Sequence, residues 1–237
     1  GTQGPLHPAY YLAETGRTTC RGPNIQNQPR KGGVRECFIP RTGHWYLAAD
    51  FHVAELASLS QVLLDMFGHS DMAEAVRRGE DLHLLSAAQF LGISYTDCLK
   101  RYRTGDKKIK DTRQLMKALN FGLPGGLGPG TFVHYARTSW GVDINFEQAS
   151  ALKGAWLNWW PEMRPYFSEM GRRVQLGGGQ FTAVQHRSGR LRGGVTYCNG
   201  CNTYFQGLTA DGARLALVRV TEECFTNPNS ALYGCRP

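Results

Sequence analysis

Apolar residues recur at helical spacing through much of this chain. Between Glu55 and Phe67, the residues Leu56, Leu59, Leu63 and Met66 would lie on one side of a helix. Similar patterns, with their stop signals, predict further helices over residues 71–78, 82–90, 112–123, 146–160 and 203–225. Trp156, Trp159 and Trp160 fall in one of these segments, where packing against neighbours is a more common role than base stacking.

Strand signals are fewer and shorter. Residues 36–39 and 45–49 are typical of paired strands around an Arg41-Thr42-Gly43-His44 turn. Residues 180–185 follow three glycines and are typical of one strand of a hairpin, whereas residues 1–30 are rich in Pro, Gly and Asn and are predicted to be extended. The chain is therefore expected to combine α-helices with a smaller amount of β structure.

Charge narrows the possible partners. The chain has 237 residues, a formal net charge of +8 and a pI near 9.2, which favours a polyanionic partner. Charge alone does not choose between nucleic acid and an acidic membrane surface. No apolar run is long enough to cross a membrane and no signal peptide is visible, so we expect no membrane association and a cytoplasmic location.

The cysteines argue against a disulfide framework. Their number is seven, which is odd, and their spacing is scattered, so reduced thiols are expected. Cys198 and Cys201 form a lone Cys-x-x-Cys pair with no second pair nearby, which disfavours a zinc site.

The strongest candidate for chemistry is residues 113–122. Arg113, Lys117 and Phe121 are spaced i, i+4, i+8 and would project from one face of a helix. Two cations suit a polyphosphate, and an aromatic ring suits a base or sugar. The alternative is an ordinary amphipathic helix with solvated cations.

Two other segments are candidates. Asp50 ends a short apolar run, which is a usual place for a carboxylate that holds Mg²⁺, although an Asp there can also cap the following helix. Residues 23–29 are dense in side-chain amides, which suit the hydrogen-bonding edges of bases; a polar turn is the alternative.

In this order and spacing, the segments resemble the family A DNA polymerases. Thr15-Gly16-Arg17 with the amide run looks like the family's primer–template segment, residues 50–56 look like its motif A, and residues 113–122 look like its motif B. Residues 79–83, Asn202 and residues 206–211 extend the match, which covers about residues 13–216.

The resemblance implies an α+β fold. On this resemblance, a right-hand polymerase palm, an antiparallel sheet with helices, would be joined to a mostly helical fingers subdomain, and the thumb would be absent. Residues 1–61 would form the first part of the palm, residues 62–195 the fingers with the motif B helix at 112–123, and residues 196–237 the palm return, truncated before motif C.

It also implies roles for single residues in two-metal nucleotidyl transfer. Asp50 would bind both Mg²⁺ ions and the carbonyl of Phe51 would help to hold the nucleotide's ion. Arg113 and Lys117 would hold the triphosphate of a deoxynucleotide, and Lys117 would protonate pyrophosphate.

Further roles follow from the same resemblance. His83 would contact a phosphate, Phe121 would pack on the base and sugar, and Glu55 would crowd the sugar 2′ position. The residues expected to touch primer–template DNA are Arg17, Asn24, Gln26, Asn202 and Gln206.

The sequence departs from the family in several places. Val53, Ala57 and Gly125 stand where the family usually has Gln, Arg and Tyr. The His-Asp-Glu of motif C does not occur among the 237 residues, so we expect one magnesium ligand to come from outside this chain. The chain would then be a fragment of a longer polymerase or one part of a split polymerase. In the split case, one partner polypeptide would carry motif C and another would carry the thumb or exonuclease.

Two other functions stay open. A relative without catalysis would be a primer–template DNA-binding or replisome module. A single-subunit RNA polymerase shares the palm chemistry, but Glu55 and the Thr-Gly-Arg segment argue against it.

Overall fold

The chain divides into two compact units. The computed structural model describes residues 4, 6–29, 31–51 and 53–236. One unit comprises residues 54–209, and the other comprises residues 1–53 with residues 210–237. These boundaries differ from the predicted ones at 61 and 195, and the names palm and fingers stay predictions.

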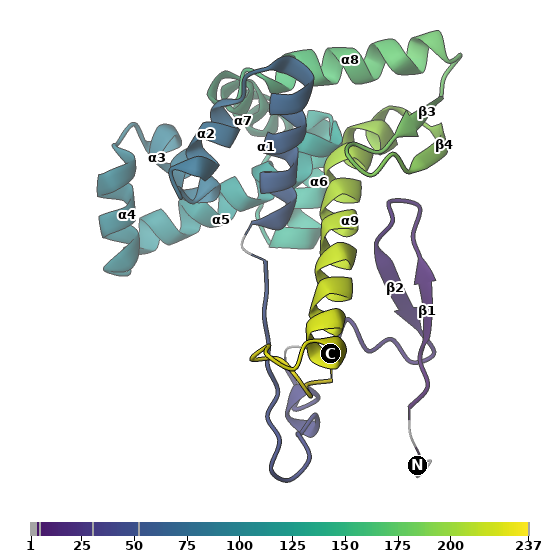
Figure 1. Ribbon diagram of the computed structural model, residues 1–237. Helices are drawn as coiled ribbons and strands as arrows, with labels where there is room; N and C mark the ends of the chain where they lie inside the picture. Colours follow the sequence, from purple (N-terminus) through teal and green to yellow (C-terminus); the bar gives the residue numbers. More distant parts are fainter. Residues whose placement is uncertain (1–3, 5, 30, 52, 237) are drawn as a thin grey trace. The chain divides into compact units, whose positions relative to one another are not determined.

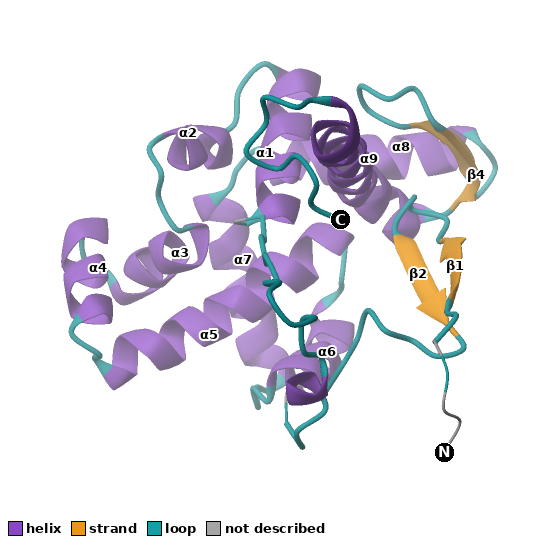
Figure 2. Ribbon diagram, turned by 60° about the horizontal axis from the view of Figure 1, so that its bottom comes forward, coloured by secondary structure: helices purple, strands orange, loops and turns teal. Residues whose placement is uncertain are grey.

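The unit of residues 54–209 is mainly helical, as Figure 2 shows. Its helices, labelled in Figure 1, are α1 (Ala54–Phe67), α2 (Asp71–Arg77), α3 (Leu82–Leu91), α4 (Tyr95–Arg103), α5 (Lys107–Gly122), α6 (Pro129–Trp140), α7 (Phe146–Trp159) and α8 (Met163–Leu176), with a short 3₁₀ turn η2 (Leu123–Gly125) after α5. Helix α9 (Tyr197–Thr226) begins in this unit and continues into the other one.

Local signals explain where several of these helices begin. Ser70, Asp81, Ser94 and Asp106 precede α2, α3, α4 and α5, and each side chain accepts a hydrogen bond from a backbone N–H of the first turn. Asn145 before α7 forms a full capping box with Gln148.

The core of this unit is built from helix faces. Leu59, Val62 and Leu63 of α1 are fully buried, as are Met116 and Leu119 of α5. Trp156 and Trp160 are 0% and 1% exposed, so the prediction that these tryptophans serve packing is confirmed for both. Helix α5 packs against α3, α4 and α6, and α6 packs against α7.

The predicted helices are present, but their bounds and number differ. Helix α5 begins at Lys107, five residues before the prediction, because Asp106 caps it there. Helices α4, α6 and α8 were not predicted. Only Cys98 of α4 is buried, so its sequence carries little apolar periodicity, and Pro129 and Pro165 lie in the first turns of α6 and α8.

The described β structure consists of two antiparallel hairpins. Strands β3 (Phe181–Val184) and β4 (Leu191–Val195) pair in the unit of residues 54–209, which confirms the predicted hairpin. Strands β1 (Ala9–Leu12) and β2 (Thr18–Arg21) pair in the other unit, with Tyr10 opposite Cys20.

The predicted strands at residues 36–39 and 45–49 are wrong. Residues 35–37 form a 3₁₀ turn, η1 (Arg35–Cys37), and residues 44–51 have no regular secondary structure. Trp45 is 92% exposed and Leu47 is 83% exposed, so these apolar side chains do not pack against another described part of the chain. A strand needs a neighbour for its backbone hydrogen bonds, and the two described sheets contain β1 to β4 alone.

Within the described part of the chain, no helix is long and apolar enough to cross a membrane.

Candidate functional site

Helix α5 places its candidate side chains on one face, as predicted. Arg113, Lys117 and Phe121 are each partly exposed, while Met116 and Leu119 between them are buried. The buried residues hold the helix against its neighbours, so the exposed face keeps a fixed orientation within this unit.

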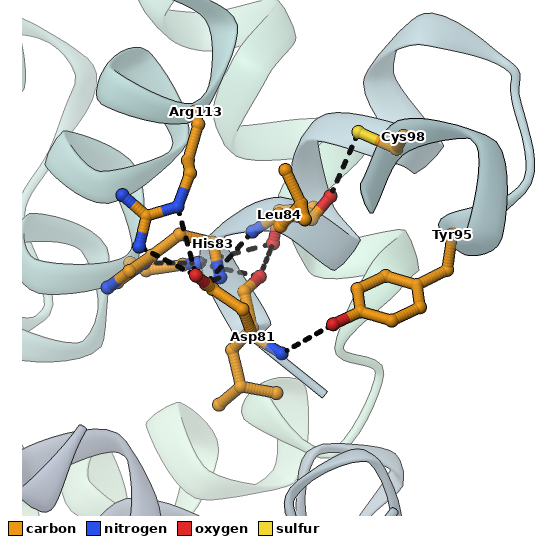
Figure 3. A network of polar contacts seen from close by, with 9 residues as sticks. Asp81, His83, Leu84, Tyr95, Cys98 and Arg113 are labelled. Atoms are coloured by element: carbon orange, nitrogen blue, oxygen red, sulfur yellow. Dashed lines mark hydrogen bonds and ion pairs between the residues drawn. The ribbon is translucent and has the colours of Figure 1, made fainter. Parts of the chain in front are cut away.

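The side chain of Arg113, on α5, forms an ion pair with Asp81, the residue that precedes α3 (Figure 3). The Oδ2 atom of Asp81 accepts from Nε and Nη2 of Arg113 at 2.9 and 2.6 Å. Its Oδ1 atom accepts from the backbone N–H groups of His83 and Leu84 and caps α3. The guanidinium carbon also lies 5.2 Å from the centre of the Tyr102 ring. Asp81 therefore orients Arg113 through one edge of its guanidinium and joins α3 to α5.

The same contacts set the charge of Asp81. Burial by itself would raise the pKa of this carboxyl. The hydrogen bonds and charge of Arg113, together with the backbone N–H of Leu84, act in the opposite direction, and the net result is a pKa below the ordinary value of 3.8. The side chains of Arg113 and Asp81 are 23% and 20% exposed, so solvent screens this pair only in part.

His83 is held by a buried amide. Its Nδ1 atom lies 3.1 Å from Nδ2 of Asn120 on α5, and His83 is only 4% exposed. The Oδ1 atom of Asn120 accepts from the indole N–H of Trp156 at 2.8 Å. The imidazole ring contacts Phe121, with ring centres 5.2 Å apart. His83 is thus brought beside the exposed face of α5.

An aromatic residue of α6 completes this surface. The ring of Trp140 stacks on Phe121 with centres 5.7 Å apart and planes 6° from parallel. The ammonium of Lys117 lies 5.5 Å from the centre of the same indole. The residues that sequence reasoning missed are Asp81, Asn120 and Trp140. Asp81 alone carried a local signal, since it precedes an apolar helical segment.

Gly122, the last residue of α5, and Gly125, in the η2 turn that follows, permit close packing. A Cβ atom on Gly122 would lie 2.7 Å from the ring of Tyr135, and one on Gly125 would lie 2.9 Å from the side-chain amide of Asn202. The departure from Tyr at position 125 therefore has a structural counterpart, because Asn202 occupies the adjacent space.

We expect Gly122→Ala to lower the free energy of unfolding by about 1–3 kcal/mol, since the added methyl group must displace the partly buried ring of Tyr135. Gly154→Ala in α7 is the matched control. No atom lies within 4 Å of its Cβ position, and this change should stabilise by up to about 1 kcal/mol. Urea unfolding of both variants checks the prediction, and equal behaviour would contradict it.

The remaining predicted residues of this unit lie on α1 and α9. Glu55 is in the first turn of α1. Asn202 and Gln206 are partly exposed on α9, and the Asn202 amide donates to the carbonyl of Cys198 at 3.0 Å. Thr209 donates to Ser58 at 2.8 Å, so the early part of α9 is tied to the start of α1.

The other unit contains the remaining candidates. Arg17 lies after the turn between β1 and β2, and its carbonyl accepts from the N–H of Ala13 at 2.8 Å. Asn24 and Gln26 are exposed, and the Asn24 side chain accepts from the N–H of Gln26 at 3.0 Å. Asp50 and Phe51 are also exposed. The metal candidates and the α5 face therefore belong to different units.

The family model described as DNA polymerase family A matches residues 2–232. The chain belongs to DNA polymerase family A. Its fold agrees with this membership: a solved structure, the POL domain of Pol1 from M. smegmatis in complex with DNA primer-template and dNTP, matches with a TM-score of 0.69. That match covers 92% of this chain and 38% of the other at 20% sequence identity. The fold is thus the α+β class that the sequence predicted.

Curated relatives carry the name DNA polymerase I. The protein of Aquifex aeolicus is 27% identical over 87% of this chain and 33% of its own length. The protein of Helicobacter pylori strain 26695 is 25% identical over 92% of this chain and 23% of its own length. This family A chain therefore spans a third or less of these relatives.

Proposed function

We propose that this chain is part of a template-directed DNA polymerase that adds deoxynucleotides to a primer 3′ end. The observation that carries the proposal is the face of α5, where Arg113, Lys117 and Phe121 lie together beside His83 in a family A chain. The solved relative of like fold contains DNA primer-template and dNTP, which supports the same ligands for this chain.

The α5 face suits a nucleoside triphosphate. Arg113 and Lys117 supply two positive charges one helical turn apart, which matches successive phosphates better than a single anion. Phe121 and Trp140 offer flat apolar surface for a base or sugar. Glu55 is assigned to the sugar 2′ position, where it would disfavour ribonucleotides.

The metal candidates suit part of a magnesium shell. Asp50 offers an exposed carboxylate and Phe51 a backbone carbonyl, and both are hard oxygen donors of the kind that Mg²⁺ prefers. Among the described residues there is no group of three or more His, Cys, Asp or Glu that could hold a metal. Nucleotide phosphates and a carboxylate from outside the 237 residues would complete the shell.

The chain's own groups then act on the substrate. Two bound divalent ions would supply activation of the attacking oxygen and stabilisation of the leaving one. Arg113, oriented by Asp81, holds the phosphates, and the Nζ of Lys117 carries the proton for the departing pyrophosphate. Arg17, Asn24, Gln26, Asn202 and Gln206 offer amide and guanidinium donors to the primer–template.

Fluorescence anisotropy of a labelled primer–template tests the proposal. The deoxynucleotide that matches the template should tighten the complex, whereas a mismatched one should not. Binding that falls with salt but ignores the matching nucleotide would instead support the DNA-binding module.

Primer extension is the second test. The chain is assayed with Mg²⁺ and four deoxynucleotides, alone and with an added polypeptide that carries His-Asp-Glu. Extension that needs the addition supports the incomplete metal shell. No extension in either case, with nucleotide-independent DNA binding, would overturn the polymerase proposal.

A further inference from the structure

The side-chain amide of Asn120 has one possible orientation. Its Oδ1 atom faces the indole N–H of Trp156 at 2.8 Å, and an indole nitrogen only donates. Its Nδ2 atom faces the carbonyl of Leu82 at 3.3 Å, and a carbonyl only accepts. A flipped amide would oppose donor to donor on one side and acceptor to acceptor on the other.

This orientation determines which nitrogen of His83 carries a proton. Nδ2 of Asn120 has two hydrogens, and its partners are Leu82, Ser86 and Nδ1 of His83. The Ser86 hydroxyl donates to the Leu82 carbonyl at 2.9 Å, so its oxygen is an acceptor toward the amide. An amide nitrogen cannot accept a hydrogen bond, so Nδ1 of His83, which lies 3.1 Å from Nδ2 of Asn120, must present its lone pair to that donor.

We propose that Asn120 and Trp156 are positioning residues that hold His83 as the neutral tautomer with its proton on Nε2. A neutral imidazole has one donor and one acceptor nitrogen, so an accepting Nδ1 leaves Nε2 as the donor. The inference rests on the proposed function, in which His83 contacts a phosphate, and it specifies the contact as a neutral N–H donated to a phosphate oxygen.

Burial makes the arrangement firm. Asn120 and Ser86 are 1% and 0% exposed and Trp156 is 0% exposed, so water does not compete for these hydrogen bonds. An imidazolium would direct a second N–H at the Asn120 amide and leave buried donors opposed. The α3–α5–α7 packing thereby selects a donor tautomer at the edge of the α5 face.

Nitrogen NMR of the chain labelled with ¹⁵N-histidine tests the tautomer directly. The His83 signals are assigned by their loss in His83→Gln. We expect an acceptor-type shift for Nδ1 and an N–H-type shift for Nε2. A protonated Nδ1, or an equal mixture of tautomers, would overturn the inference.

Two matched tryptophan variants test the positioning role. Trp156→Phe removes the indole donor while keeping an aromatic ring, so the Asn120 amide loses one of its two constraints. The His83 signals should move toward a tautomer mixture, and triphosphate binding should weaken about 2–10-fold, the effect of one hydrogen bond. Trp160→Phe is the control, because Trp160 is equally buried and its indole nitrogen has no described partner. Equal spectra for the two variants would contradict the positioning role.

The readouts separate this inference from the proposed function. If the Nε2 signal identifies the donor tautomer but a deoxynucleoside triphosphate leaves it unchanged, the phosphate contact is wrong and the tautomer stands. If the nucleotide shifts the His83 signals but those signals show the proton on Nδ1, the proposed phosphate contact stands and the inference about the tautomer is wrong.

Discussion

The matching deoxynucleoside triphosphate is expected to bind about 10–100-fold more weakly to the primer–template complex of Lys117→Ala than to that of the unaltered chain. Lys117 lies one turn from Arg113 on the α5 face, and a hydrogen bond to a charged group contributes about 1.5–3 kcal/mol. Each 1.4 kcal/mol corresponds to about a tenfold change in affinity. Anisotropy titration of the nucleotide at fixed salt measures the effect.

Lys108→Ala is the matched control for this variant. Lys108 is an exposed cation of the same helix, but it lies about two and a half turns before Lys117 and so points to the opposite side. The two variants lose the same charge, so long-range attraction to DNA falls equally in both. A similar loss of nucleotide affinity in both would show that α5 acts only through its overall charge.

The sequence was sufficient to predict the α5 face because its signal is local. Four-residue spacing places Arg113, Lys117 and Phe121 together on any helix, whatever surrounds it. The hairpin of β3 and β4 was predictable for a similar reason, since glycines and a short apolar run lie next to each other.

The contacts around that face were not predictable from local pattern. Asp81 and Arg113 are 32 residues apart in the sequence, and Asn120 and Trp156 are 36 apart. Their contacts therefore depend on how α3, α5 and α7 pack. The failed strands at residues 36–39 and 45–49 show the same limit. Alternating apolar residues become a strand only when a neighbour supplies backbone partners, and the described chain provides none there.

We expect Asp81→Ala to lower the free energy of unfolding by about 2–4 kcal/mol. The variant loses the cap of α3, which is worth about 1 kcal/mol, and leaves the half-buried Arg113 without its carboxylate, which costs about 1.5–3 kcal/mol. Urea unfolding followed by circular dichroism measures the change. Asp97→Ala is the control, because Asp97 is an exposed acid in the first turn of α4, and its loss should cost about 1 kcal/mol or less.

The Asp81–Arg113 pair also predicts how the free energy of unfolding depends on pH. The variant Asp81→Asn removes the negative charge alone, because its amide oxygen can still cap α3. Burial raises the pKa of Asp81 in the folded chain, but its polar contacts, with Arg113 the strongest of them, together bring the pKa below 3.8. A carboxyl with a lowered folded pKa stabilises the fold fully above its unfolded pKa, and this stabilisation disappears as the pH falls through the folded value. The stability difference between the unaltered chain and Asp81→Asn should therefore be constant from about pH 5 to pH 7 and shrink below about pH 4. A difference that grew on acidification would show that Arg113 does not hold Asp81 as a carboxylate.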